Sequence, residues 1–449
     1  MSNLLISKSK IFRLLFWLLL VCSIWLTISV FVFIRFDAPI NFAHVSIIIS
    51  LLTIFLIYRQ KISLSLPHAL LLLLFSYLIF LSLIKGFFIK PETVTYINKT
   101  FLTHYLYKTE NYPKFNSIFL YFKELFHLFF TLITIFVASI IIKKSDINLD
   151  DFKYYLQKYL YYLVVFYLII YCIFYFYHDI ISLISTNRYN GFRSFTSVKD
   201  QYFSRYFTYR LGITHTEPSF SGLYVLIFAP LIFLKSKYSG RLKILVPLFF
   251  LFNSSKYVVA VALIIILLCG VVFLVKLLRN RKYFILFPIF VVLLVLSASV
   301  FLYLNWEKFY NILSGQSGFS RIFSMVSGLK FFLSNFFTGM GIGQYPVYFT
   351  NNFGGTDLIK NVLIRVPSAQ SMLINGLAEF GASYILFILF LGVFIIKAFK
   401  RDKYLFYCGV ILLFNLNASA GNGFNMIYYW VLLTFFTFYA WGNKEIEHK

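Results

Sequence analysis

Acidic residues and cysteines are scarce in this chain of 449 residues, which has 16 Asp and Glu against 41 Lys and Arg. The four cysteines all lie inside apolar runs, and no pair has the spacing of a metal site, so they indicate neither a disulfide framework nor a zinc centre. The sequence also lacks a Walker motif, a haem-attachment motif and a Ser/His/Asp order. These absences give no support to the enzyme classes that such short motifs identify. The cysteines are Cys22, Cys172, Cys269 and Cys408.

Hydrophobic residues make up 60% of the chain, and the mean hydropathy is +0.81. Such values exclude an ordinary soluble protein. A net charge of +25 would suggest nucleic acid as a partner in a soluble chain. Here the basic residues stand in short clusters between long apolar runs, which favours membrane topology and no nucleic acid.

The apolar runs predict an all-α polytopic membrane protein with about twelve transmembrane helices, because a helix of roughly 20 residues spans a bilayer. We expect one integral membrane domain over residues 1–449, with the first span retained. The expected spans are 11–34, 40–58, 66–84, 117–142, 159–177, 219–234, 242–253, 257–275, 283–304, 382–399, 404–418 and 425–441.

Basic residues cluster in one alternating set of loops, so the positive-inside rule places these loops and both termini in the cytoplasm. Three long loops, 85–116, 178–218 and 305–381, then lie outside, and the last is a large extracytoplasmic loop late in the chain. The cytoplasmic clusters are Arg59/Lys61, Lys143/Lys144/Lys153/Lys158, Lys235/Lys237/Arg241/Lys243, Lys276/Arg279/Arg281/Lys282 and Lys397/Lys400/Arg401/Lys403.

The segment 210–220, next to an apolar span, holds Arg210, His215 and Glu217. Ionisable groups at a membrane boundary are costly and often mark a site. The same loop supplies Arg193 and Arg205, and guanidinium groups suit a lipid diphosphate because they bind phosphate oxygens in pairs. The alternative is structural: Glu217-Pro218-Ser219 also has the features of a helix start, with Ser219 as its cap.

The late loop contains two further candidates. Apolar residues recur at helical spacing from Ile322 to Phe336, with Arg321, Ser324 and Gly328 on the other side. This pattern predicts an amphipathic helix that either anchors at the bilayer surface or faces substrate. The string 339–343 (Gly-Met-Gly-Ile-Gly) lacks the βαβ context of a nucleotide site and forms either an anion-binding nest or a plain turn.

A third group, Lys123, Glu124 and His127, stands at one end of the fourth span. These side chains either flank a polar cavity or mark an interfacial helix end.

In this order, Arg210 with 217–219, Arg321, the glycines 339–343, and the segments 370–373 and 377–381 resemble the O-antigen ligase/polymerase superfamily, and its repeat-unit polymerase branch in particular. The resemblance covers roughly residues 205–400. It implies a metal-independent, inverting glycosyltransferase that uses no cofactor. Ligase-type members usually carry a His where this chain has Gln370, which favours the polymerase branch.

The resemblance implies transfer of a glycan from undecaprenyl diphosphate to the sugar end of another lipid-linked repeat unit, on the outer face of the bacterial inner membrane. Arg210 and Arg321 are then expected to hold the diphosphate with help from Arg193 and Arg205, while Gly341, Gly343 and Gln370 form the substrate loop. The candidate base is Glu217 or His215, since an attacking hydroxyl must lose its proton.

Two other functions stay open. One is ligase-type transfer of a finished glycan to a lipid or protein acceptor, and the other is a polysaccharide flippase or transporter. Transporters tend to show repeats and ionisable residues inside their spans, and this sequence shows almost none. The expected partners are the undecaprenyl diphosphate-linked oligosaccharide as donor and acceptor, membrane lipid, a chain-length regulator and a flippase.

Overall fold

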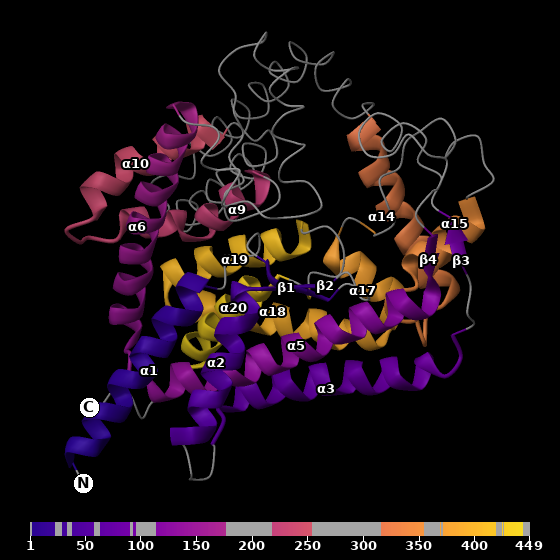
Figure 1. The fold of residues 1–449 in the computed structure, drawn as a ribbon, viewed down its shortest axis with the longest axis horizontal. Helices are drawn as coiled ribbons and strands as arrows, with labels where there is room; N and C mark the ends of the chain where they lie inside the picture. Colours follow the sequence, from indigo (N-terminus) through magenta and orange to yellow (C-terminus); the bar gives the residue numbers. More distant parts are fainter. Residues whose placement is uncertain are drawn as a thin grey trace, which may run out of the picture.

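A computed structural model gives the fold for residues 2–22, 29–33, 38–57, 63–89, 93–95, 114–176, 218–253, 316–353, 369, 371–418, 424 and 426–442. Within these ranges the protein is predominantly helical, as the sequence predicts (Figure 1). Two short antiparallel strand pairs stand between helices. They are β1 (Ser29–Phe33) with β2 (Ala38–Asn41), and β3 (Thr93–Thr95) with β4 (Lys114–Asn116).

The helices of the first half are α1 (Ser2–Cys22), α2 (Phe42–Ile57), α3 (Leu66–Gly86), α5 (Ser117–Lys144), α6 (Leu149–Phe176), α9 (Pro218–Phe228) and α10 (Ser239–Asn253), with the 3-10 helix η1 (Ala229–Phe233) between the last two. Those of the second half are α14 (Gln316–Ser334), α15 (Tyr345–Phe353), α17 (Met372–Phe380), α18 (Ser383–Arg401), α19 (Lys403–Ala418) and α20 (Ile427–Trp441).

Three of these helices are long and apolar enough to cross a membrane: α3, α5 and α18. In Figure 1 α3 and α5 run side by side along the lower edge of the molecule. The predicted spans 66–84, 117–142 and 382–399 are therefore confirmed as apolar helices of membrane-spanning length. The helices α2, α19 and α20 also coincide closely with predicted spans, but they are shorter.

Helix α20 forms the centre of the bundle, and all its side chains from Ile427 to Ala440 are buried. Large aromatic rings fill the space around it: Trp430 packs edge-on against Phe75 of α3 and stacks on Phe424. Such rings each bury a large apolar area, which accounts for their concentration in this core. In contrast, α3 and α18 leave one apolar side exposed along their length, as expected of helices that face lipid.

Three predicted spans need correction. The first, 11–34, is not one helix, because α1 ends at Cys22 and Ser29–Phe33 pairs as a strand with Ala38–Asn41. The alternating valines and phenylalanines of that strand favour extended backbone. The helix that contains the fifth span, α6, begins at Leu149, ten residues before the expected start of the span at 159. The sixth, 219–234, stays helical only to Phe228 and continues as a 3-10 turn containing Pro230, because proline cannot donate to the preceding helix.

The predicted spans 257–275 and 283–304 lie outside the described residues, so the expected total of twelve spans stays a prediction.

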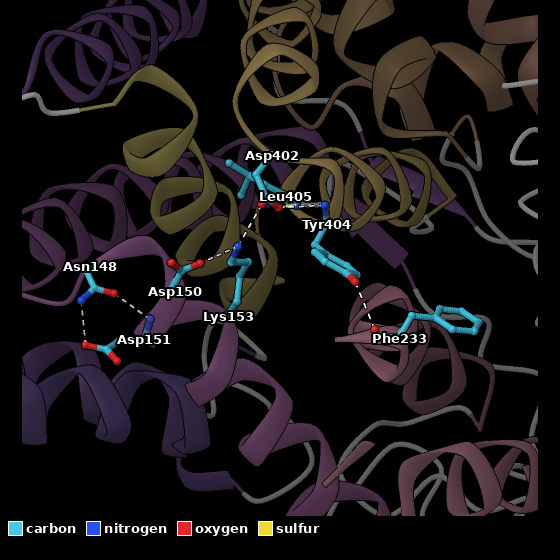
Figure 2. A network of polar contacts seen from close by, with 8 residues as sticks. All are labelled: Asn148, Asp150, Asp151, Lys153, Phe233, Asp402, Tyr404 and Leu405. Carbon is cyan, nitrogen blue, oxygen red and sulfur yellow. Dashed lines mark hydrogen bonds and ion pairs between the residues drawn. The ribbon is translucent and has the colours of Figure 1, made fainter. Parts of the chain in front are cut away.

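Segments from several predicted cytoplasmic loops meet at one end of the bundle. Lys153 Nζ binds Asp402 Oδ2 at 2.9 Å, and Tyr404 donates from its hydroxyl to Phe233 O at 3.1 Å (Figure 2). Arg13 Nε donates to Ser145 O at 3.1 Å at the same end. The expectation that these loops share one side of the protein therefore agrees with their contacts.

Asp402 connects two helices at this junction. Its Oδ1 accepts from the amides of Tyr404 and Leu405 at 2.8 and 3.0 Å, so it caps α19, while its Oδ2 binds Lys153 (Figure 2). Burial opposes the charge of both partners, but their mutual hydrogen bond and attraction outweigh it. The pKa of Asp402 is lowered, and the pKa of Lys153, which also binds Asp150 at 2.8 Å, is raised.

Candidate functional site

Three of the predicted site residues lie within the described residues. Gly341 and Gly343 stand in the turn between α14 and α15, and Arg321 lies in the first half of α14. The other predicted residues, Arg193, Arg205, Arg210, His215, Glu217 and Gln370, lie outside them. The described part of the candidate site consists of α14, the glycine turn, α15 and α17.

The glycine string after α14 is a turn with three left-handed residues, since φ is 62° at Gly339, 99° at Gly341 and 70° at Gly343. Only glycine adopts such angles without strain. A Cβ on Gly339 would lie 2.2 Å from Glu379 O, and one on Gly343 would lie 2.6 Å from Leu120 O. The string thus lets the backbone pass closely between α17 and α5.

The buried side chain of Glu379 holds this turn in place. Its Oε1 accepts from Gly343 N at 3.0 Å, and its backbone oxygen accepts from Gly341 N at 3.0 Å. Met340 N donates to Ala378 O at 2.9 Å in the same pairing. Of the two glycine amides that would contribute to an anion-binding nest, Gly343 N is therefore bonded to the carboxylate of Glu379 and Gly341 N to its backbone oxygen, so both donors already have partners within the protein.

The turn is also bound to the ends of α3 and α5. Lys85 Nζ donates to Gly339 O at 3.2 Å, and Gln344 Nε2 donates to Ser117 O at 3.0 Å. Lys85 is near the last residue of α3, and Ser117 is the first residue of α5. The predicted outward loops 85–116 and 305–381 therefore meet here, at the opposite ends of α3 and α5 from the contacts of Lys143 and Ser145.

The predicted amphipathic helix is confirmed as α14, and its small-residue side packs on α17. A Cβ on Gly328 would lie 2.7 Å from Ile374 Cγ2 and 3.0 Å from Ala369 Cβ, so glycine permits the close approach. Tyr345 of α15 donates to Ser324 O at 2.7 Å. Burial, with a smaller contribution from the charge of Glu379, raises the pKa of Tyr345 and keeps this donor protonated.

A separate small core fills the space between α14, the turn, α15 and α17. Its buried members are Phe331, Met340, Tyr345, Phe349, Ala369 and Ala378. This core makes the late-loop segments one packed unit that rests on the ends of the apolar helices.

Helix α17 begins beside Gln370 and is capped by Ser371, whose Oγ accepts from Ile374 N at 3.3 Å. The same hydroxyl donates to Asn417 Oδ1 of α19 at 2.6 Å. Asn417 is not singled out in the sequence analysis, although Asn415 and Asn417 are amides in an otherwise apolar predicted span, and such amides usually have polar partners in the folded protein. This contact fixes the start of α17 to the end of α19.

A partly open groove of about 320 Å³ lies next to this junction, between α18 and α19. Its walls are apolar apart from Asn417 at the α17 end. A groove of this kind fits an aliphatic chain whose polar end lies near Ser371 and Asn417. The lining residues are Met372, Leu373, Ile388, Leu391, Gly392, Ile395, Leu413, Leu416 and Asn417.

The predicted helix start at 217–219 is confirmed, because α9 begins at Pro218. Proline is well suited to the first helical position. The assignment of Ser219 as the cap is wrong, since Ser219 is the second helical residue and Glu217 directly precedes the helix. Asn415 Nδ2 of α19 donates to Leu223 O at 2.6 Å, so α9 and the Ser371–Asn417 junction are both tied to the same end of α19.

His127 of α5 points into the bundle and is buried, with its ring 5.9 Å from the ring of Phe126. Its Nδ1 has no hydrogen-bond partner among the described residues. In the part of the chain that the structure describes, no three His, Cys, Asp or Glu side chains gather in a way that could hold a metal ion. His127 therefore belongs to the buried interior, whereas Lys123 and Glu124 at the same end of the span are partly exposed.

Comparison of the chain with protein-family models, curated proteins and solved structures finds no match. Fold and site together define a helical membrane protein in which a packed late-loop unit covers one end of the apolar helices. Any narrower function rests on the chemistry of the residues and on the resemblance stated above.

Proposed function

We propose that this protein is a polysaccharide repeat-unit polymerase of the bacterial inner membrane. It transfers a glycan from undecaprenyl diphosphate to the sugar end of another lipid-linked repeat unit, on the outer face of that membrane. Both termini then lie in the cytoplasm, at the end of the bundle where the basic segments meet, and the late-loop unit faces outward.

The observation that carries this proposal is the packing of three motif segments into one unit. The helix of Arg321, the glycine turn and α17 contact one another through Gly328, Ile374 and Glu379. These segments are the ones on which the resemblance rests, and nothing in their spacing along the chain requires them to meet. A site made of these motifs needs them together.

The apolar groove beside α17 supports a substrate with a long hydrocarbon chain. It opens between α18 and α19, which lie among the apolar helices, and its polar end adjoins Ser371 and Asn417. A lipid carrier bound there would have its headgroup near Gln370 and the late-loop unit.

In the proposed reaction, a hydroxyl of the acceptor sugar attacks the anomeric carbon of the donor sugar. The bond between this carbon and the diphosphate oxygen breaks, and the diphosphate leaves with the electron pair. Glu217 or His215 takes the hydroxyl proton. Arg210 and Arg321, with Arg193 and Arg205, bind the diphosphate and stabilise its growing charge.

The glycine turn has a positioning part in this proposal. Because Gly341 and Gly343 are bonded to Glu379, the turn holds the end of α14 against α17 and so fixes the direction of the Arg321 helix. The turn is proposed as substrate loop through its contacts with α17, the helix that follows residues 370 and 371 in the chain.

The test is the surface-glycan profile of cells that carry single variants Arg210→Ala, Glu217→Gln or Arg321→Ala in place of the wild-type gene. The proposal predicts that single repeat units persist while the ladder of longer chains is lost. The exposed Lys400→Ala, at the basic end of α18, is the matched control and retains the ladder. Immunoblots of membrane fractions establish that each variant is present.

Each other function gives a different outcome. Full ladders in all three variants contradict the proposal. Polymer that stays on the carrier lipid indicates the ligase. Single units that stay on the inner side of the membrane indicate the flippase.

A further inference from the structure

Helix α14 exposes large apolar side chains and buries two serines beside Gly328 and Phe331. Val326 and Leu333 are 59% and 71% exposed, whereas Ser324 and Ser327 are 1% and 2% exposed. A helix on the surface of a water-soluble domain has the opposite arrangement. This side of α14 is therefore adapted to an apolar surrounding.

The buried polar side is satisfied within the protein. Ser327 Oγ donates to Phe323 O at 2.7 Å, and Ser324 O accepts from Tyr345 at 2.7 Å. Gly328 lets α17 approach closely on the same side. The side of α14 that carries Ser324, Ser327 and Gly328 is therefore the one that packs against α15 and α17. The opposite side, with Val326 and Leu333, faces away from them.

The membrane helices next to α14 also expose apolar side chains. Along α3 those of Leu73 and Phe80 are exposed, and along α18 those of Leu389 and Ile396. Phe336 and Phe337, which follow α14, are exposed as well.

Direct contacts fix that junction. Ala382 N, immediately before α18, donates to Phe336 O at 2.6 Å, and Lys85 of α3 donates to Gly339 O at 3.2 Å. One end of α14 is thus held where α3 ends and α18 begins. In Figure 1 α14 climbs steeply away from the right-hand ends of α3 and α5. A helix that leaves the ends of membrane-spanning helices at a steep angle runs along the membrane surface.

We propose that α14 lies in the interface of a phospholipid bilayer, with Val326, Leu329, Leu333 and Phe337 toward the acyl chains. Lys330, exposed on the same side, extends its ammonium to the headgroups. Phe336 and Phe337 stand between the end of α14 and the start of α18, where Phe336 O accepts from Ala382 N. This placement does not depend on the catalytic assignment, because it follows from exposure and contacts alone.

The test uses spin labels at Val326, Leu329 and Leu333, each as a single cysteine in a background without the four native cysteines. The protein is reconstituted in phosphatidylethanolamine/phosphatidylglycerol vesicles, and collision with oxygen and with a water-soluble nickel chelate is measured. The three labels are expected to collide several-fold more with oxygen than with the chelate. A label at the exposed Asn352 of α15 is the polar control and should favour the chelate.

Two outcomes overturn the proposal. Preference for the chelate at all three positions places this side in water. Low collision with both reagents shows that protein covers it, from a second copy or from another part of the chain. A photo-crosslinking residue at Leu333 in the otherwise unaltered chain gives an independent reading: adducts with lipid support the proposal, and adducts with protein alone contradict it.

Discussion

The substitution Gly343→Ala tests the contact that holds the glycine turn between α5 and α17. Two costs arise at this one position. An L-residue in left-handed backbone loses roughly 1–2 kcal/mol, and φ is 70° here. In addition, the new Cβ would lie 2.6 Å from Leu120 O and 2.9 Å from Leu120 C, so backbone must move. Such overpacking typically costs about 1–3 kcal/mol.

These costs together predict a loss of roughly 2–5 kcal/mol, unless the turn shifts and relieves both. A shift would stretch the bond from Gly343 N to Glu379 Oε1, so the loss is expected in either case. The assay is the thermal midpoint of the purified protein in detergent, followed by tryptophan fluorescence.

The matched control is Gly240→Ala in the first turn of α10, where an added Cβ meets nothing within 4 Å. Alanine there restricts the unfolded chain and is expected to leave stability unchanged or raise it by at most about 1 kcal/mol. The reasoning is refuted if the two variants have the same midpoint, because the turn would then not be held as the structure has it.

Two further predictions concern charged side chains. Lys153→Met should lower the thermal midpoint at neutral pH, because the partly buried carboxylate of Asp402 loses the cation that neutralises it. Since the pKa of Asp402 is lowered from 3.8 and that of Lys153 is raised from 10.5, the deficit should be constant between about pH 5 and 9 and shrink progressively as the pH falls below about 4; a deficit that stays constant down to the lowest pH at which the protein is folded contradicts the pair. Glu379→Gln keeps an oxygen for Gly343 N, whereas Glu379→Leu leaves that donor buried without one, at a cost of about 1–3 kcal/mol; equal midpoints for these two variants would refute the role assigned to Glu379.

Hydropathy is sufficient to find the helices that face lipid. Long runs that are largely apolar predict α3, α5 and α18 to within a few residues, because a helix is the only way for an open chain to satisfy its backbone in lipid. Hydropathy alone gives the wrong prediction where one apolar run contains both a helix and a strand. Residues 29–33 belong to an apolar run that resembles a span, yet Ser29–Phe33 pairs as a strand with Ala38–Asn41.

Contacts between distant segments account for what the sequence leaves open at the site. Glu379 stands in a short motif whose order could be seen, but its bond to Gly343 depends on how α17 packs against the turn. Asn417 is one amide in an apolar span, and its bond to Ser371 crosses 46 residues. The alternation of small and apolar residues in α14 predicts the helix and its two sides, whereas the choice of the buried side depends on α15 and α17.

The central claim, transfer of a glycan between lipid-linked units, is tested most directly with purified protein in liposomes. The substrate is a single undecaprenyl diphosphate-linked repeat unit from the same cells, and the products are identified by mass spectrometry. The account predicts two or more repeat units on one carrier together with free undecaprenyl diphosphate in matching amounts, and neither product with Arg321→Ala. Unchanged substrate after incubation with the wild-type protein, under conditions where the protein is folded, contradicts it.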